Sequence, residues 1–233
     1  MCDIEIGGST GDIARVYTAH MESDRAPVSP VIVQRILSPA QAAARTALID
    51  AAIELATEGG YNAVDMREVA KRAGMSVAKA YQQVGTKDQL LLSALMELGE
   101  RSRETLHNKL AEGDTPADRV AQTFSRIMKH VAQRPLLYRA VYRAYVASSP
   151  ALGELVGSAG FGPERTSWIG EAMRAGDLHG HSEEDLNTAA RILSCLFQGA
   201  MVTAAAGRDV DDVTDLLTEA AHRLLPDTRP AAG

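Results

Sequence analysis

The sequence predicts an all-α protein, and three features of its 233 residues support this prediction. Apolar residues recur at helical spacing along most of the chain, and no segment shows the apolar-polar alternation of a half-buried strand. Serine or threonine, followed by proline or by glutamine three residues later, marks several helix starts. Hydrophobic residues make up 45% of the chain, which is enough to bury a core at this length.

An irregular segment precedes the first predicted helix. Residues 1–37 lack sustained periodicity and hold adjacent glycines and two prolines, so we expect an extension that is either disordered or lies before a start at Met21. We assign this extension no function. Ser38 and Gln41 then supply a cap and an N3 glutamine, with a proline between them. They predict a helix that continues to the glycine pair at 59–60.

A short helix and a tight turn are predicted next. Asp65 and Glu68 can satisfy each other's backbone N–H groups as a capping box, which predicts a helix over residues 66–73. Gly74 follows, and glycine adopts at little steric cost the left-handed conformation that ends many helices.

A second short helix follows the turn. Ser76 is a good N-cap for a helix over residues 77–84. Thr86 and Gln89 then form another capping box, which opens a longer helix that Gly113 closes. Two short helices separated by a turn of three or four residues match the helix-turn-helix motif, whose second helix enters the major groove of DNA.

The remainder of the chain is predicted to be a helical bundle. Four glycines between residues 151 and 162 interrupt any helix there. We divide the chain into a helix-turn-helix domain over residues 38–92, a second helical domain over 93–226 and a tail over 227–233. Beyond the helix that begins near Thr86, the predicted helices of the second domain span residues 116–131, 135–147, 163–175, 183–206 and 211–225.

Charge is distributed unevenly along the chain. The 24 Lys and Arg residues against 30 Asp and Glu give a net charge of −6, but residues 39–96 hold six basic and six acidic groups. The acidic excess therefore lies outside the helix-turn-helix. Lys71, Arg72, Lys79 and Lys87 lie on the two short helices and the next helix start, a local positive face that suffices for a groove contact.

Other function classes are disfavoured. No segment approaches the roughly 18 uninterrupted apolar residues of a membrane helix, and the N-terminus lacks signal-peptide order, so we expect a cytoplasmic protein with no membrane partner. Cys2 and Cys195 are too few for a disulfide framework, and no metal or cofactor is expected. Cys195 and the pair His179 and His181 lack an identifiable base or orienting group, so we predict that the protein is not an enzyme.

Residues 45–95 resemble the DNA-binding domain of TetR-family transcriptional repressors. The matching positions are Gly60-Tyr61, Val69-Ala70, Ala73-Gly74, Tyr81 and Lys87. Two further strings, YNAVDMREVAKRAG and RPLLYRAVYRAYVASS, are similar to those of the KstR-type branch, the actinobacterial regulators of steroid and lipid catabolism. The resemblance implies an N-terminal three-helix helix-turn-helix domain followed by a helical ligand-binding and dimerisation domain.

The resemblance also implies which residues contact double-stranded DNA. Tyr81 and Lys87 match phosphate contacts, while Lys79 and Gln82 can reach base edges. The chain departs from the family pattern at Ala78, Lys79, Ala80 and Val84, which stand where glycine, threonine, a larger apolar residue and an aromatic are usual. The resemblance therefore does not fix the base contacts, and we expect the smaller Ala80 and Val84 to anchor the helix less firmly. Alternatively, Lys79 and Gln82 form a solvated helix face and Tyr81 packs on the preceding helix. The predicted DNA-binding residues are Arg67, Ser76, Val77, Ala78, Lys79, Tyr81, Gln82 and Lys87.

A small apolar effector is the second expected partner. Ligand pockets often lie between helices, lined by bulky apolar side chains with few polar groups. The same residues can equally be ordinary core, and Arg143 and Arg174 can pair an anionic ligand or lie on the surface. The candidate pocket residues are Phe124, Met128, Tyr138, Tyr142, Trp168, Met173 and Phe197.

A homodimer is the third expectation. Apolar stripes on the last two predicted helices can form a four-helix interface between two copies, or can face the same chain's core. The candidate interface residues are Ala189, Ile192, Leu193, Leu196, Ala200, Thr203, Leu216, Leu217, Ala220 and Leu224. A two-fold dimer predicts a pseudo-palindromic operator, from which an apolar ligand releases the repressor. The alternative is a helical interaction module that has lost specific DNA binding.

Overall fold

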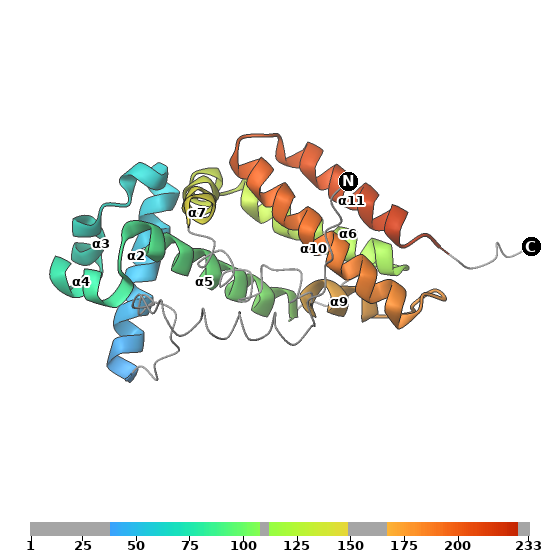
Figure 1. Ribbon diagram of the computed structural model, residues 1–233, viewed down its shortest axis with the longest axis horizontal. Helices are drawn as coiled ribbons and strands as arrows, with labels where there is room; N and C mark the ends of the chain where they lie inside the picture. Colours follow the sequence, from blue (N-terminus) through green and yellow to red (C-terminus); the bar gives the residue numbers. More distant parts are fainter. Residues whose placement is uncertain (1–37, 108–111, 149–166, 228–233) are drawn as a thin grey trace, which may run out of the picture. The chain divides into compact units, whose positions relative to one another are not determined.

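The computed structural model describes residues 38–107, 112–148 and 167–227 (Figure 1). Within these ranges the chain forms nine helices and no strand, so the predicted all-α class is confirmed. The helices are α2 (Pro39–Ala63), α3 (Met66–Arg72), α4 (Val77–Val84), α5 (Lys87–His107), α6 (Pro116–Ala132), α7 (Pro135–Ala147), α9 (Ser167–Arg174), α10 (Glu183–Ala205) and α11 (Val210–Leu224).

The predicted helix starts are largely confirmed by their caps. The Ser38 hydroxyl accepts the backbone N–H of Gln41, whose side chain accepts the N–H of Ser38 in return. Thr86 and Gln89 make the same reciprocal pair. Ser76 caps α4 through the backbone N–H of Lys79 at 3.3 Å. Each cap satisfies N–H groups that the first turn of a helix leaves without partners.

The glycine pair interrupts the first helix where the sequence predicts its end: Gly59 and Gly60 have non-helical backbone angles, with Gly60 at φ +68° and ψ −158°, and a short helical stretch after this kink completes α2 to Ala63. One local prediction was wrong in detail. Asp65 caps α3 by accepting the N–H of Arg67 at 2.8 Å, but Glu68 does not complete a capping box. Its carboxylate lies instead beside Lys71 and Arg72, where two cations attract it more strongly than one backbone N–H.

The helices of the described ranges pack into one continuous apolar core. Helix α2 contacts α3, α4, α5 and α7, and Gly74, at φ +66°, makes the turn between α3 and α4. Helix α6 packs on α9 and α11, and α10 packs on α7, α9 and α11. Figure 1 shows α10 and α11 side by side, joined by a short turn. The expected extension over residues 1–37, the glycine-rich stretch over 151–162, the start of the helix expected at 163 and the end of the tail lie outside the described residues.

Helix α10 is long and apolar enough, by length and composition alone, to cross a membrane. It nevertheless begins with three acidic residues, and Leu186, Leu193 and Phe197 on its inner face are buried in this chain's core. A core helix of a globular protein passes the same test of length and composition, so this helix does not by itself indicate a membrane partner.

Candidate nucleic-acid interface

Helix α4 has one buried face and one exposed face. Ala80 and Val84, the small residues at its two anchor positions, are both 0% exposed against the other helices. Tyr81, by contrast, is 50% exposed. These two small side chains are therefore completely buried and anchor the inner face of α4. Of the predicted DNA-contacting residues on this helix and its cap, Ser76, Ala78, Lys79, Tyr81 and Gln82 are exposed and Val77 is partly buried.

Arg45 of α2 fixes the C-terminal end of α4 from behind. Its guanidinium donates to the backbone carbonyl of Gln83 at 3.3 Å and to the Ser93 hydroxyl of α5 at 2.9 Å. Partial burial lowers the pKa of Arg45. A cation near the last carbonyls of a helix also complements the helix dipole. This support was not identified from the sequence, since an arginine in the first turns of an amphipathic helix carries no signal for such a contact.

The acidic residues of α2 are neutralised locally. Arg72 of α3 lies within 2.7 Å of Glu58, 3.5 Å of Glu54 and 3.6 Å of Glu68. The hydrogen bond from Arg72 is the main reason why the pKa of Glu58 lies below its usual value. Lys71 lies 3.5 Å from Glu68. Arg72 is therefore held among three carboxylates, whereas Lys71 is an exposed cation with one weak surface contact.

Two predicted DNA-contacting cations keep their charge available. Within the described residues, Arg67 on α3 and Lys79 on α4 are exposed and form no ion pair or side-chain hydrogen bond. Unpaired cations on rigid helices suit an anionic partner, because no internal contact has to be broken before they bind.

Lys87 has a different environment at the start of α5. Its ammonium lies 3.8 Å from the ring centroid of Tyr61, and the guanidinium carbon of Arg143 lies 4.0 Å from the same centroid. The Tyr61 hydroxyl donates to the Asp88 carboxylate at 2.7 Å. Burial is the main reason why the pKa of Lys87 is lowered, and the hydrogen bond to Asp88 is the main reason why the pKa of Tyr61 is raised.

The candidate effector residues of the second half form an aromatic cluster within the core. The Phe124 ring stacks on Phe197 with centroids 5.5 Å apart, and the Trp168 ring meets both rings edge-on at 5.9 and 5.2 Å. Met128 and Met173 are fully buried in the same core. The geometry brings these predicted residues together from α6, α9 and α10. Ring-to-ring packing of this kind is equally what an ordinary core contains.

Tyr138 and Tyr142 of α7 are buried polar residues. Tyr142 is 3% exposed and its ring meets Tyr145 edge-on at 5.9 Å. Neither Tyr138 nor Tyr142 makes a side-chain hydrogen bond to any residue that the structure describes. Burial is the main cause that raises the pKa of both phenols. The residues are buried as a whole, but among the described residues the fully buried side-chain nitrogen or oxygen without a partner is His181 Nε2 and not a phenol oxygen. The two hydroxyls are thus open to hydrogen bonds with water or with a ligand.

The candidate dimer residues divide between the two faces of α10 and α11. Ala189, Leu193, Ala200 and Leu217 are buried in this chain's own core. These four side chains are therefore already covered before any partner binds. The outward part of the set consists of Ile192, Leu196 and Leu216, which are exposed, and Thr203, Ala220 and Leu224, which are partly buried.

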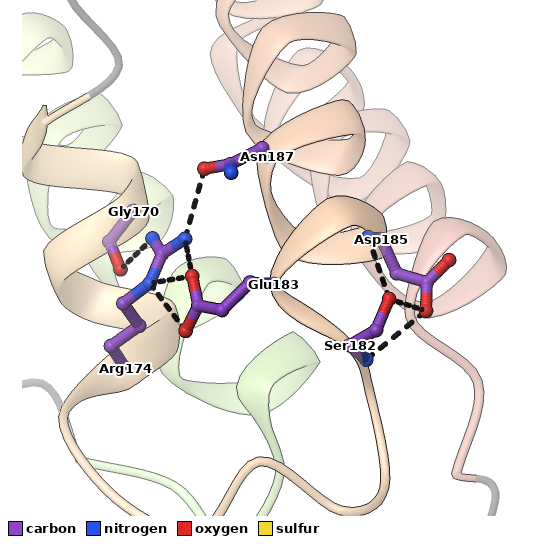
Figure 2. Close-up of polar contacts among 6 residues, drawn as sticks. All are labelled: Gly170, Arg174, Ser182, Glu183, Asp185 and Asn187. Carbon is purple, nitrogen blue, oxygen red and sulfur yellow. Dashed lines mark hydrogen bonds and ion pairs between the residues drawn. The ribbon is translucent and has the colours of Figure 1, made fainter.

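Arg174 is engaged within the chain. Figure 2 shows its guanidinium facing Glu183 and Asn187 of α10, and it donates to the Glu183 carboxylate at 2.6 Å and to the Asn187 side-chain Oδ1 at 2.9 Å. A further hydrogen bond reaches the Gly170 carbonyl. These contacts join α9 to α10 and pair the charge of Arg174 within the chain. The sequence predicts Arg174 as a partner for an anionic ligand or as a surface residue, and it gives no sign of this contact.

Arg119 of α6 is a second structural arginine, also not identified from the sequence. It is 2% exposed, and it donates to five backbone carbonyls, of which those of Met173 and Asp177 lie at 2.7 Å. Burial is the main cause that lowers its pKa. The guanidinium thus caps the C-terminal turn of α9 and holds the loop that follows. Gly176 lies so close that an added Cβ would come within 3.0 Å of Arg119.

The enzyme candidates do not assemble a site. Cys195 is exposed on α10, and His179 is buried with its Nδ1 3.3 Å from the Asp227 carboxylate. Within the described ranges, no group of three His, Cys, Asp or Glu side chains lies close enough together to hold a metal ion.

Comparison with known proteins identifies relatives of this chain. Residues 48–94 match the family described as bacterial regulatory proteins, tetR family. The chain is 30% identical over 193 residues to the HTH-type transcriptional repressor KstR of Mycobacterium tuberculosis, covering 82% of this chain and 84% of that protein. It is 36% identical over 119 residues to KstR of Mycolicibacterium smegmatis, covering 51% and 58%. That second match spans little more than half the relative's length.

Solved structures share the fold. A TetR transcriptional regulator from Rhodococcus sp. RHA1 superposes with a TM-score of 0.66 at 28% identity, covering 82% of this chain and 100% of that one. The FadR repressor of Thermus thermophilus, solved in complex with lauroyl-CoA, has a TM-score of 0.62 at 22% identity and covers 81% and 98%.

Proposed function

The chain belongs to the TetR family of bacterial regulatory proteins, among its KstR-type members, and from this premise we propose that it is a cytoplasmic, ligand-responsive transcriptional repressor. Its KstR relatives are named as transcriptional repressors, which places it among regulators rather than enzymes. In this proposal a homodimer binds a pseudo-palindromic operator through two copies of α4, and a small apolar effector weakens that binding. The observation that carries the proposal is the exposed, unpaired face of α4 on a fully buried anchor.

We propose that different residues of this face contact different parts of the DNA. Lys79 and Gln82 contact base edges, while Arg67, Ser76, Tyr81 and Lys87 hold phosphate oxygens. Ala78, with its small side chain, allows close approach of the helix to the groove. The fixed position of α4, capped by Ser76 and supported by Arg45, favours one register on DNA because few side chains have to be ordered on binding.

The aromatic cluster and the two buried tyrosines support the effector part of the proposal. Phe124, Trp168 and Phe197 supply apolar surface between helices. Tyr138 and Tyr142 supply hydroxyls without partners in the described residues, so the proposed ligand is an apolar molecule that carries a carbonyl or hydroxyl group. Steroid and fatty-acyl compounds are the first to test, since the chain is similar to KstR-type repressors and a FadR of the same fold was solved with lauroyl-CoA.

The exposed stripes support the dimer. Ile192 and Leu196 of α10 lie on an outward face near Gly199, where an added Cβ would meet nothing within 4 Å, and Leu216 of α11 is 61% exposed. Two copies of the α10 and α11 pair can cover these faces in a four-helix interface.

Pull-down of fragmented genomic DNA by the purified chain, followed by sequencing, tests the proposal. We expect one enriched pseudo-palindrome and a stoichiometry of two chains for each half-site pair. Titration of the recovered duplex with a ketosteroid or an acyl-CoA should then weaken binding about 5- to 150-fold, the range of ordinary allosteric coupling. A folded dimer that enriches no palindrome would favour a helical interaction module instead, and the proposal would be withdrawn.

A further inference from the structure

Tyr61 lies where three helices meet. It follows the break in α2, where Gly60 takes a positive φ and lies beside the start of α7, so that an added Cβ would be in ordinary van der Waals contact with Leu136, 3.8 Å from its carbonyl oxygen. Helix α2 also packs on α5 and α7. A residue at this junction contacts both the helix-turn-helix side and the second half of the chain.

The Tyr61 ring separates two cations. The Lys87 ammonium from α5 lies 3.8 Å from the ring centroid, and the Arg143 guanidinium carbon from α7 lies 4.0 Å from it. Two side-chain groups this close to one centroid would overlap on a single face, so steric exclusion puts them on opposite faces of the ring. Both are attracted by the negative potential of the ring and repelled by each other.

Asp88 fixes the ring and strengthens both contacts. The Tyr61 hydroxyl donates to the Asp88 carboxylate at 2.7 Å, a charge-assisted bond that locks the ring orientation. It also shifts electron density toward the ring, which favours a cation over either face. The lowered pKa of Lys87, caused mainly by burial and further by the charge of Arg143, agrees with an ammonium that the cluster holds partly out of water.

We propose that Tyr61 is the positioning residue for the Lys87 ammonium and that Arg143 couples this contact to α7, an inference that rests on the proposed function of Lys87 as a phosphate anchor. Arg143 repels Lys87 across the ring and so favours release of the ammonium to a DNA phosphate. A shift of α7 that withdraws Arg143 lets Lys87 settle on the ring. Helix α7 also carries Tyr138 and Tyr142, so an effector that contacts these tyrosines and a phosphate that binds Lys87 both favour one position of α7 over another.

Binding of a mixed-sequence duplex tests this coupling without knowledge of the operator, because non-specific binding depends on phosphate contacts. The wild type, Lys87→Gln, Arg143→Gln and the double variant are titrated between 50 and 200 mM salt. Lys87→Gln should lower the salt slope by about one unit, which corresponds to about 3-fold over this salt range. Arg143→Gln should weaken binding about 3-fold in the wild-type background and have no effect beside Lys87→Gln.

Arg139→Gln is the matched control, since Arg139 is an exposed arginine one turn earlier on α7, near Gly207 rather than Tyr61. Its loss should change duplex binding equally in both backgrounds, as expected for a distant charge. Equal effects of Arg143→Gln and Arg139→Gln in both backgrounds would overturn the coupling while leaving DNA binding intact. A wild-type chain that binds no duplex would remove the proposed function and the inference together.

A spectroscopic measurement tests the positioning role separately. In protein whose lysines carry ¹³C-methyl groups, the Lys87 methyl signal should lie upfield because of the Tyr61 ring current. Tyr61→Phe keeps the ring and should retain most of this shift, whereas Tyr61→Leu should abolish it. A Lys87 signal at the position of an exposed lysine in wild-type protein would contradict the inference even if Tyr61→Leu fails to fold.

Discussion

The outward face of α4 and the aromatic cluster around Phe124 carry the two halves of the proposed function. They differ in how many contacts their side chains already make within the chain. On α4 the charged and polar groups are exposed and unpaired. In the cluster the rings of Phe124, Trp168 and Phe197 contact one another. An unsatisfied polar surface on a rigid helix indicates a partner, whereas a satisfied apolar interior does not distinguish a ligand site from core.

The two regions are also held in place differently. Helix α4 is anchored by small apolar residues and by Arg45, which is only partly buried. Helix α9, which brings Trp168 to the cluster, depends on the buried guanidinium of Arg119. A scaffold built on one buried charge is more sensitive to a single substitution than one built on distributed apolar contacts.

Arg119→Met should therefore produce the largest effect. It leaves several backbone carbonyls without a donor, and we expect the free energy of unfolding to fall by about 3 to 5 kcal/mol. Urea unfolding followed by circular dichroism measures it. Arg223→Met removes an exposed arginine that pairs with Glu219 one turn away, and should cost at most about 0.5 kcal/mol. Equal losses in the two variants would mean that Arg119 does not hold α9.

Lys79→Ala should have the second-largest effect, and it should change DNA binding rather than folding stability. Losing a base contact should weaken operator binding by about 1 to 3 kcal/mol and relax the preference at one base pair, with unchanged unfolding. Fluorescence anisotropy on a series of single-base variants of the operator measures both effects. Lys71→Ala is the control, because Lys71 is already beside Glu68. Uniform weakening across all the operator variants would reassign Lys79 to a phosphate.

This contrast explains what the sequence could predict. Helix bounds followed from caps such as Ser76 and Thr86, since these signals are local. The full burial of Ala80 and Val84 did not follow from the sequence, where both residues are smaller than the family pattern. Contacts between distant residues did not follow, because nothing near Arg45 or Arg119 in the sequence marks the carbonyls of Gln83 or Met173 as their partners. The dimer stripes were predicted as sets, but only the packing shows that Leu193 and Leu217 face inward.

Tyr142→Phe tests whether the buried tyrosines of α7 contribute to effector binding rather than to folding stability. Because its hydroxyl has no hydrogen-bond partner in the described residues, its removal should leave the free energy of unfolding unchanged or raise it by up to about 1 kcal/mol. The same variant should lose part of the response to a ketosteroid or an acyl-CoA. Thermal unfolding and operator titration measure the two outcomes. A destabilisation above about 2 kcal/mol would show that the hydroxyl is bonded within the chain.

The smallest expected effect concerns pH. His222 of α11 lies 3.0 Å from Asp118 of α6, and this hydrogen bond is the main cause that raises the pKa of His222 above 6.5. Because the pKa of His222 is raised in the folded state, the His222–Asp118 pair contributes its full stabilisation below pH 6.5, and this stabilisation is lost as the pH rises through the folded-state pKa of His222. Since the pair is about half exposed, the free energy of unfolding should fall by a few tenths of a kcal/mol between pH 6 and 8. His222→Asn should remove this dependence, and a variant that retains it would assign the effect to another group.

The most direct test of the account is the ratio of affinities for the selected palindrome and for a scrambled duplex of equal length at 150 mM salt. A reader helix with Lys79 and Gln82 toward the bases predicts a ratio of about 1,000 or more, reduced at least tenfold when both are replaced by alanine. A ratio near one for the wild-type dimer would contradict the account, because the exposed face of α4 would then bind only the charge of DNA.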